Sequence, residues 1–409
     1  MDGTPAERVV ALDLIRGIAV LGILAINIAG FAGPPAAILS PDLPNPGTFA
    51  DASAFAATFV LFEGKMRALF AILFGASLVL YVERVDARGG HGDAAQMRRL
   101  GWLALFGLLH FYLLWWGDIL FLLAICGMAA LLARELPVKT LAISALAIFA
   151  IWHLAGMAMT YPDIRAGEHV RLGTASPAER DALGAYLEAA ARNARTEMAV
   201  LRGSFLSLAH FRLTEQAFWP VNVLFTAGVE IVSLMLLGMV LYRTGFFTGG
   251  WPACRLARTA WIGTGLGLAL TAMLLAWAWP RRFPLRAMDA AFLYWAAIPH
   301  LLMAVGYAAI LVLLAPRVAA SAIGRSLVAA GRMAFSNYIG TSLVMTFVFY
   351  GWGLGLGGRF GHAPLMVFVV GAWAAMLVWS KAWLARYRRG PLEWLWRSLC
   401  ERQWLANAR

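Results

Sequence analysis

The chain has 409 residues, of which 61% are hydrophobic and only 14% charged, and its formal net charge is +12. Apolar runs long enough to cross a bilayer recur along the whole sequence, which excludes an ordinary soluble domain and predicts an all-α polytopic membrane protein. The basic residues fall in short clusters between these runs, so we attribute the positive charge to membrane topology and expect no nucleic-acid partner. The cysteines show neither a disulfide framework nor zinc-ligand spacing, and we expect no metal.

The hydropathy pattern predicts about ten transmembrane helices in a single membrane domain over residues 1–409. With both termini in the cytoplasm, most loop arginines face inward, as the positive-inside rule requires. Arg281, Arg282 and Arg286 would instead lie outside, where they could anchor the interface or meet an anionic headgroup. We expect a multi-pass protein of the bacterial cytoplasmic (inner) membrane, with self-association left open. In chain order, the predicted spans are 11–32, 66–82, 99–116, 118–133, 138–160, 218–241, 257–279, 291–315, 331–350 and 364–385.

Two segments outside the spans have helical signatures. Residues 161–217 form the longest polar stretch, and Ser176 with Glu179 has the form of a capping box that opens a helix to about Leu201. We interpret this stretch as an outward helical cap between spans five and six. Residues 390–405 begin with Gly-Pro and place their apolar residues on one face, which predicts a cytoplasmic interfacial helix.

The first span carries a carboxylate and a guanidinium among apolar residues. An arginine at this depth costs about 2.5 to 3.5 kcal/mol unless it has a partner, and Asp13 precedes Arg16 on the same helical face. Asn27 follows Arg16 at a spacing that returns to nearly the same direction around the helix. We therefore expect Asp13, Arg16 and Asn27 to line a polar cavity.

The apolar segment 55–62 is too short to span a membrane and is predicted to be interfacial or re-entrant. It ends at Glu63, Gly64 and Lys65. The charged side chains of Glu63 and Lys65 are expected at the mouth of the cavity that the first span lines.

His110 falls inside the third span, about 15 Å from its inner end. A histidine there can be a general base, because its pKa lies near working pH, or equally an interhelical hydrogen bonder. Asp118 would lie about 12 Å from His110 on a continuous helix, too far for a direct bond. The two could work together only if the chain breaks at Gly117 or a substrate bridges them; otherwise Asp118 caps the fourth span.

Other polar side chains fall at membrane depth. Glu230 and His300 are candidates for a cavity or proton path, and each could also pair with Arg16 or with the other. His153 ranks below them. Asn337 could contact a ligand, although asparagine also joins membrane helices by ordinary hydrogen bonds.

Several of these segments resemble the YeiB family, also called domain of unknown function 418. The matching pieces are LDLIRGIAVLGILAIN, FEGKMRALFAILFGASL, HFYLLWWGDIL, LMLLGMVLYRTGFF, GRMAFSNYIGTSLVMTFVFYGWGLGL and GPLEWLWR. They run from Leu12 to Arg397, so the resemblance covers nearly the whole chain.

The opening segment also resembles that of transmembrane acyltransferases, including the lysosomal heparan glucosaminide acetyltransferases and bacterial enzymes that acylate surface glycans. The resemblance implies transfer of an acyl (acetyl) group from cytoplasmic acyl-CoA to a hydroxyl or amine of a glycan, lipid or small molecule at the membrane or its outer side. The glycan enzymes carry a catalytic histidine after the arginine, and this chain has Asn27 at that position. If the chain is an acyltransferase, the resemblance therefore implies His110 as the remaining candidate for the general base. Arg16 or Asn27 would stabilise the oxyanion.

A transporter or permease for a small anionic or lipidic solute is the alternative function. It would use Arg16, Glu230 and His300 for binding or proton coupling. A non-catalytic partner in envelope assembly is a third possibility. Dependence on acyl-CoA separates the first function from the other two.

Overall fold

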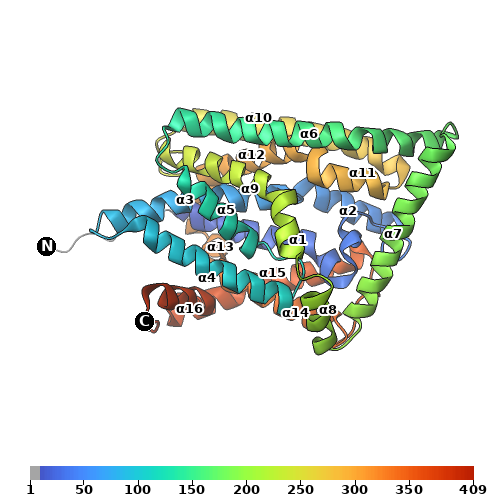
Figure 1. The fold of residues 1–409 in the computed structure, drawn as a ribbon. Coiled ribbons are helices and arrows are strands. Elements are labelled where there is room, and N and C mark those ends of the chain that lie inside the picture. The colour runs from blue at the N-terminus through green and yellow to red at the C-terminus, as the bar shows by residue number, and fades with distance from the viewer. Residues whose placement is uncertain (1–9) are drawn as a thin grey trace.

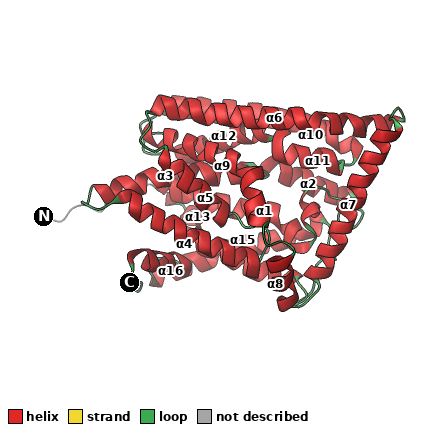
Figure 2. Ribbon diagram, viewed as in Figure 1, coloured by secondary structure: helices red, strands yellow, loops and turns green. Residues whose placement is uncertain are grey.

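A computed structural model describes residues 10–409, and these residues fold almost entirely into helices (Figures 1 and 2). No β-strand occurs in this range. The helical character predicted from composition is therefore confirmed. The helices are α1 (Val10–Ala32), η1 (Pro35–Ile38), α2 (Phe49–Leu61), α3 (Lys65–Asp86), α4 (Gly92–Leu113), α5 (Leu120–Leu132), α6 (Val138–Leu172), α7 (Pro177–Leu201), α8 (Phe205–Thr214), α9 (Trp219–Arg243), α10 (Ala253–Ala278), η2 (Trp279–Arg281), α11 (Leu285–Ala290), the π-helical η3 (Ala291–Trp295), α12 (Ala297–Ala320), α13 (Ala322–Arg332), α14 (Ala334–Phe349), α15 (His362–Arg386) and α16 (Pro391–Glu401).

Within the described residues, 7 helical segments are long and apolar enough to cross a membrane, by length and composition. The helices α5 and α14 are apolar but shorter. The polytopic membrane character is thus supported, while the ten-span count and the side of each terminus stay predictions. The predicted spans coincide with helices but differ from them at some ends. The span 99–116 extends past the end of α4 at Leu113, the span 118–133 begins before α5, and the span 331–350 crosses the boundary between α13 and α14.

The C-terminus lies at one end of the bundle, and α7 lies across the opposite end (Figure 1). Contacts between neighbouring helices mark each of these ends. At the end of the C-terminus, Tyr242 donates to Glu83 at 2.9 Å and Trp396 donates to the carbonyl of Arg99 at 3.0 Å. At the α7 end, Arg282 pairs with Asp42 at 3.0 Å. We call these the terminal end and the α7 end.

Helix α7 begins where its capping box predicts. The Ser176 hydroxyl accepts from the backbone N–H of Glu179 at 3.2 Å, and the Glu179 carboxylate accepts from the backbone N–H of Ser176 at 2.8 Å. His169 at the end of α6 lies 2.8 Å from Glu179. These contacts fix α7 at the C-terminal end of α6, which has 35 residues and is about 52 Å long.

Helix α1 is the core of the bundle. Of its apolar 18-residue stretch 78% is buried inside the protein, against 22% for the corresponding stretches of α10 and α15. It packs closely on α13 because glycines face each other. A Cβ on Gly17 would lie 2.1 Å from the carbonyl oxygen of Leu327, and a Cβ on Gly331 would lie 1.8 Å from that of Asp13. This close approach brings the α13–α14 junction beside Arg16.

Helices α2 and α3 form one broken helix. Together Phe49–Asp86 cover 38 residues, and the break falls at Gly64, whose φ of 68° is in the left-handed region. A Cβ there would lie 1.9 Å from Nδ1 of His300, so glycine is also required by space. The short segment predicted at 55–62 is therefore the first half of this broken helix.

Candidate functional site

A cavity of about 210 Å³ opens beside Arg16 between α1, α3, α4, α5, α14 and α16. Its charged groups are Asp13, Arg16, Arg99, Arg332 and Glu393, and its remaining wall is mostly apolar. The cavity thus combines a net positive charge with an apolar interior. The apolar and uncharged lining residues are Ile23, Phe70, Leu73, Phe74, Ser77, Leu103, Ile119, Leu120, Leu123, Gly331, Ala334, Phe335, Tyr338 and Trp396.

Neighbouring side chains hold two arginines of this cavity, Arg16 and Arg99, in place. Arg16 donates to Asp13 at 3.3 Å, as the helical spacing predicts, and to the hydroxyl of Ser77. The guanidinium of Arg99 lies 3.9 Å from the ring centroid of Tyr81 and 4.7 Å from that of Trp396. Such stacking fixes the plane of Arg99, and its Nη1 atom donates to the side chain of Gln96 at 3.4 Å.

Glu393 of α16 caps the N-terminus of α14. Its carboxylate accepts from the backbone N–H of Phe335 at 2.8 Å and of Ser336 at 3.1 Å. These are the first-turn donors that a helix leaves unpaired, and a carboxylate is favoured there. Burial nevertheless raises the pKa of Glu393, with the hydrogen bonds from Ser336 and Phe335 opposing it. The C-terminal helix is therefore part of the cavity wall, not a separate appendage.

His110 and Asp118 meet directly. The Nδ1 atom of His110 lies 2.8 Å from Oδ1 of Asp118, and their side chains are 0% and 4% exposed. The separation of a continuous helix does not apply, because α4 ends at Leu113 and the following turn folds back before α5. Of the two conditions for a contact, a break in the helix is the one present, and it begins at Leu114 rather than Gly117. Asp118 also caps α5, accepting from the backbone N–H of Phe121 at 2.8 Å.

The pairing sets the tautomer of His110. An ionised carboxylate only accepts hydrogen bonds, so Nδ1 carries the proton and Nε2 keeps its lone pair. Nε2 is buried and has no hydrogen-bond partner within residues 10–409. An oriented imidazole with a free Nε2 is the arrangement of a general base.

Tyr338 lies between His110 and the cavity. Its ring centroid is 5.1 Å from that of His110, and the same side chain lines the cavity beside Arg16. The Tyr338 hydroxyl donates to the carbonyl of Gly117 at 3.1 Å and accepts from the N–H of Ile119 at 3.2 Å. Tyr338 therefore holds the turn that carries Asp118.

Two predicted binding residues lie elsewhere. Asn27 lines a separate space of about 10 Å³, which shares only Ile23 and Tyr338 with the cavity beside Arg16. Asn27 and Arg16 therefore line different spaces. Asn337 joins α13, α14 and α15, donating to Ala330 and Ser380 at 3.0 Å each and accepting from Trp379 at 2.7 Å. Its amide is fully used within the protein.

A second group of ionisable residues surrounds the break between α2 and α3. Glu230 of α9 lies 3.3 Å from Nη2 of Arg67 and 3.9 Å from Nε2 of His153. It pairs with neither Arg16 nor His300, so the predicted partners are wrong. Lys65 is fully buried and donates to the carbonyl of Phe59 at 2.7 Å. We call Glu63, Lys65, Arg67, His153, Glu230 and His300 the central cluster.

Other members of the central cluster have unused polar atoms. Nε2 of His300 and Nε2 of His153 are buried without a hydrogen-bond partner in the described chain. His153 Nδ1 lies 2.8 Å from the carbonyl of Phe149, which only accepts, so the proton is on Nδ1. Glu63 lines a space of about 20 Å³ together with Thr58 and His362, which is large enough for a water molecule.

Sequence reasoning missed Arg67, Tyr338 and Glu393. Arg67 had a detectable signal, because a second arginine inside an apolar helix carries the same insertion cost as Arg16. Glu393 looked like an ordinary interface charge. Only the packing of α16 against α4 and α14 brings Glu393 to the cavity.

The chain is 30% identical over 403 residues to the uncharacterized protein YeiB of Escherichia coli (strain K12), and the alignment covers 96% of each chain. It is 29% identical over 402 residues to the uncharacterized protein YxaH of Bacillus subtilis (strain 168), covering 97% of this chain and 95% of the relative. A family model described as "Protein of unknown function (DUF418)" matches residues 241–403. No solved structure matches the chain.

Proposed function

This chain belongs to the YeiB family, and on that premise we propose that it is a transmembrane acyltransferase that uses acyl-CoA. One observation carries the proposal. A basic cavity with an apolar interior reaches Tyr338, whose ring contacts a buried histidine that Asp118 orients. Such a cavity suits an anionic donor with an acyl tail, and the oriented histidine suits proton removal from an acceptor.

In this mechanism the phosphates of acyl-CoA meet Arg16, Arg99 and Arg332, and the thioester enters the apolar part of the cavity. Movement of the Tyr338 ring opens the path to His110. Nε2 of His110 removes the proton from an acceptor hydroxyl or amine, whose heteroatom attacks the thioester carbonyl. The carbon–sulfur bond then breaks, and the leaving thiolate takes the proton from His110.

We also propose the membrane arrangement that this reaction needs. The protein would cross the bacterial cytoplasmic membrane about ten times, with both termini and the cavity beside Arg16 in the cytoplasm and α7 outside. The orientation is supported by three arginines at the terminal end, of which Arg84 and Arg243 lie in the last turns of α3 and α9 and Arg134 lies in the connection after α5.

The first test is binding of acetyl-CoA and longer acyl-CoAs to the protein in nanodiscs, measured by isothermal titration calorimetry. Arg16→Gln should weaken binding about tenfold or more, since a charge-assisted contact to phosphate is lost. Arg397→Gln is the matched control, because Arg397 lies on α16 but pairs with Glu401 outside the cavity. Absence of saturable binding by folded protein would contradict the acyltransferase proposal.

A transporter is the second candidate, and the central cluster favours it. Broken helices with ionisable groups at membrane depth are typical of substrate and proton sites in transporters. Release of free CoA thiol from bound acyl-CoA, followed with a thiol reagent, distinguishes the two functions. Transfer releases the thiol, whereas transport leaves the compound chemically unchanged.

A further inference from the structure

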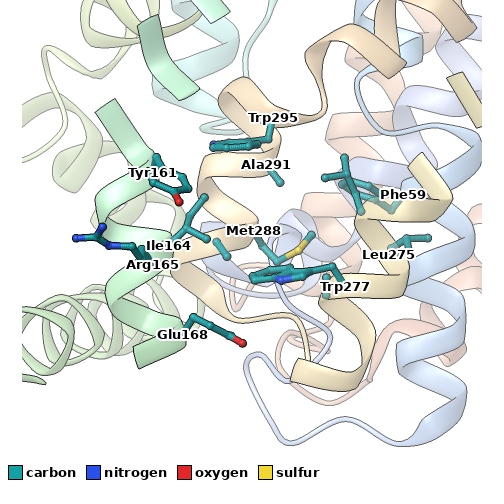
Figure 3. Close-up of a pocket in the computed structure, with 13 residues that line it drawn as sticks. Phe59, Tyr161, Ile164, Arg165, Glu168, Leu275, Trp277, Met288, Ala291 and Trp295 are labelled. Atoms are coloured by element: carbon teal, nitrogen blue, oxygen red, sulfur yellow. The ribbon is translucent and has the colours of Figure 1, made fainter. Parts of the chain in front are cut away.

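A cavity of about 370 Å³ lies at the α7 end and is separate from the cavity beside Arg16 (Figure 3). It lies between the distal part of α6 and the helices α10, α11 and η3. Its wall is almost entirely apolar or aromatic, including Phe59, Leu275, Trp277, Met288 and Trp295. A slot of this kind accepts an apolar chain, since few polar groups face it.

The helices that form the slot face lipid. Only 28% of the apolar 18-residue stretch of α6, and 22% of that of α10, is buried within the protein. On the same helices, Met159 is 78% exposed and Met273 is 68% exposed. Large apolar side chains so exposed on membrane helices contact acyl chains, so an occupant enters from the bilayer.

The polar groups of the slot gather at one end. Glu168 is held by Arg281 at 3.0 Å and by Arg171, so its charge is compensated. Arg165 is exposed and makes no ion pair within residues 10–409, and it projects from α6 on the side away from Trp277 (Figure 3). Trp277 lies beside this region, with its ring centroid 4.7 Å from the guanidinium of Arg281, and such aromatic residues concentrate at headgroup depth. Cations therefore outnumber carboxylates where a headgroup would lie.

We propose that this slot binds one chain of an anionic membrane lipid from the leaflet at the α7 end. The chain lies between α6, α10 and η3, and the headgroup lies beside Arg165 and Arg281. The floor of the slot is Phe59, whose ring is 5.8 Å from that of His300 and whose carbonyl accepts from Lys65. The lipid chain thus ends against residues that hold the central cluster. This binding is independent of acyl transfer.

The test is native mass spectrometry of the full chain in a non-ionic detergent, titrated with dioleoyl phosphatidylglycerol or dioleoyl phosphatidylcholine. Leu275→Trp places an indole in the slot and should weaken phosphatidylglycerol binding about tenfold or more. Met273→Trp adds the same indole to the lipid-facing side of α10 and should leave binding unchanged. The wild-type protein should prefer phosphatidylglycerol to phosphatidylcholine.

A surface variant covers the case in which Leu275→Trp fails to fold. Arg165→Glu reverses an exposed charge and should weaken phosphatidylglycerol binding several-fold while leaving phosphatidylcholine binding unchanged. Arg192→Glu on α7, where Arg192 pairs with Glu188, is its control. Equal binding of both lipids by the wild type, or unchanged binding after either slot substitution in folded protein, would overturn the proposal.

Discussion

At the scale of single residues, the contact between His110 and Asp118 yields the most direct prediction. Asp118→Asn keeps an acceptor for the backbone N–H of Phe121 but no longer fixes the proton on Nδ1 of His110. Acyl transfer should fall a hundredfold or more, in the range of general-base losses of about 10² to 10⁴, while acyl-CoA affinity stays the same. Single-turnover release of CoA thiol measures the first quantity and calorimetry the second. Retained transfer would remove the pair from the mechanism.

The pair of Glu230 and Arg67 makes a residue-scale prediction about stability. Glu230→Gln leaves a guanidinium inside the bundle without its carboxylate, which should cost about 3 kcal/mol. The double variant Glu230→Gln with Arg67→Met removes both charges and should regain most of that loss. Thermal unfolding in detergent compares the two. A double variant no more stable than the single one would contradict the pairing.

At the scale of elements, Glu393 links α16 to the start of α14. Burial raises the pKa of Glu393 above the usual 4.5. The contribution of this side chain to the free energy of unfolding is therefore full below pH 4.5, and it is lost as the pH rises through the raised pKa. Between pH 4.5 and pH 8, the wild type should therefore lose more thermal stability than Glu393→Gln does. Unfolding temperatures of both proteins across this range check the difference. Parallel pH profiles would show that the carboxyl group makes no such contribution.

The elements also show what sequence can predict. The capping box of α7 and the pair of Asp13 and Arg16 were predictable because their partners lie within one helical turn. The contact of His110 with Asp118 depends on where α4 ends, and no local pattern fixes the path of the turn after it. Glu230 and Arg67 are 163 positions apart, so only helix packing decides that they meet. Contacts within one helical turn could therefore be predicted from the sequence, and contacts between distant helices could not.

At the scale of the whole molecule, the native cysteines can test the proposed orientation. Cys254 is exposed at the start of α10, whereas Cys126 and Cys400 are buried, so a membrane-impermeant maleimide should label Cys254 first. The connection before α10 lies at the terminal end, where Arg243 donates to the carbonyl of Leu136 at 3.0 Å.

Labelling should therefore occur in inverted vesicles but not in intact cells. The double variant Cys254→Ser with Arg192→Cys on α7 should show the reverse pattern, because its accessible cysteine lies at the other end of the bundle (Figure 1). Each protein carries the control for the other, since both labelling sites must be accessible in permeabilised cells. If Cys254 is labelled from outside, the cavity beside Arg16 opens away from the cytoplasm. Cytoplasmic acyl-CoA could then not reach it, and the acyltransferase proposal would fail through topology alone.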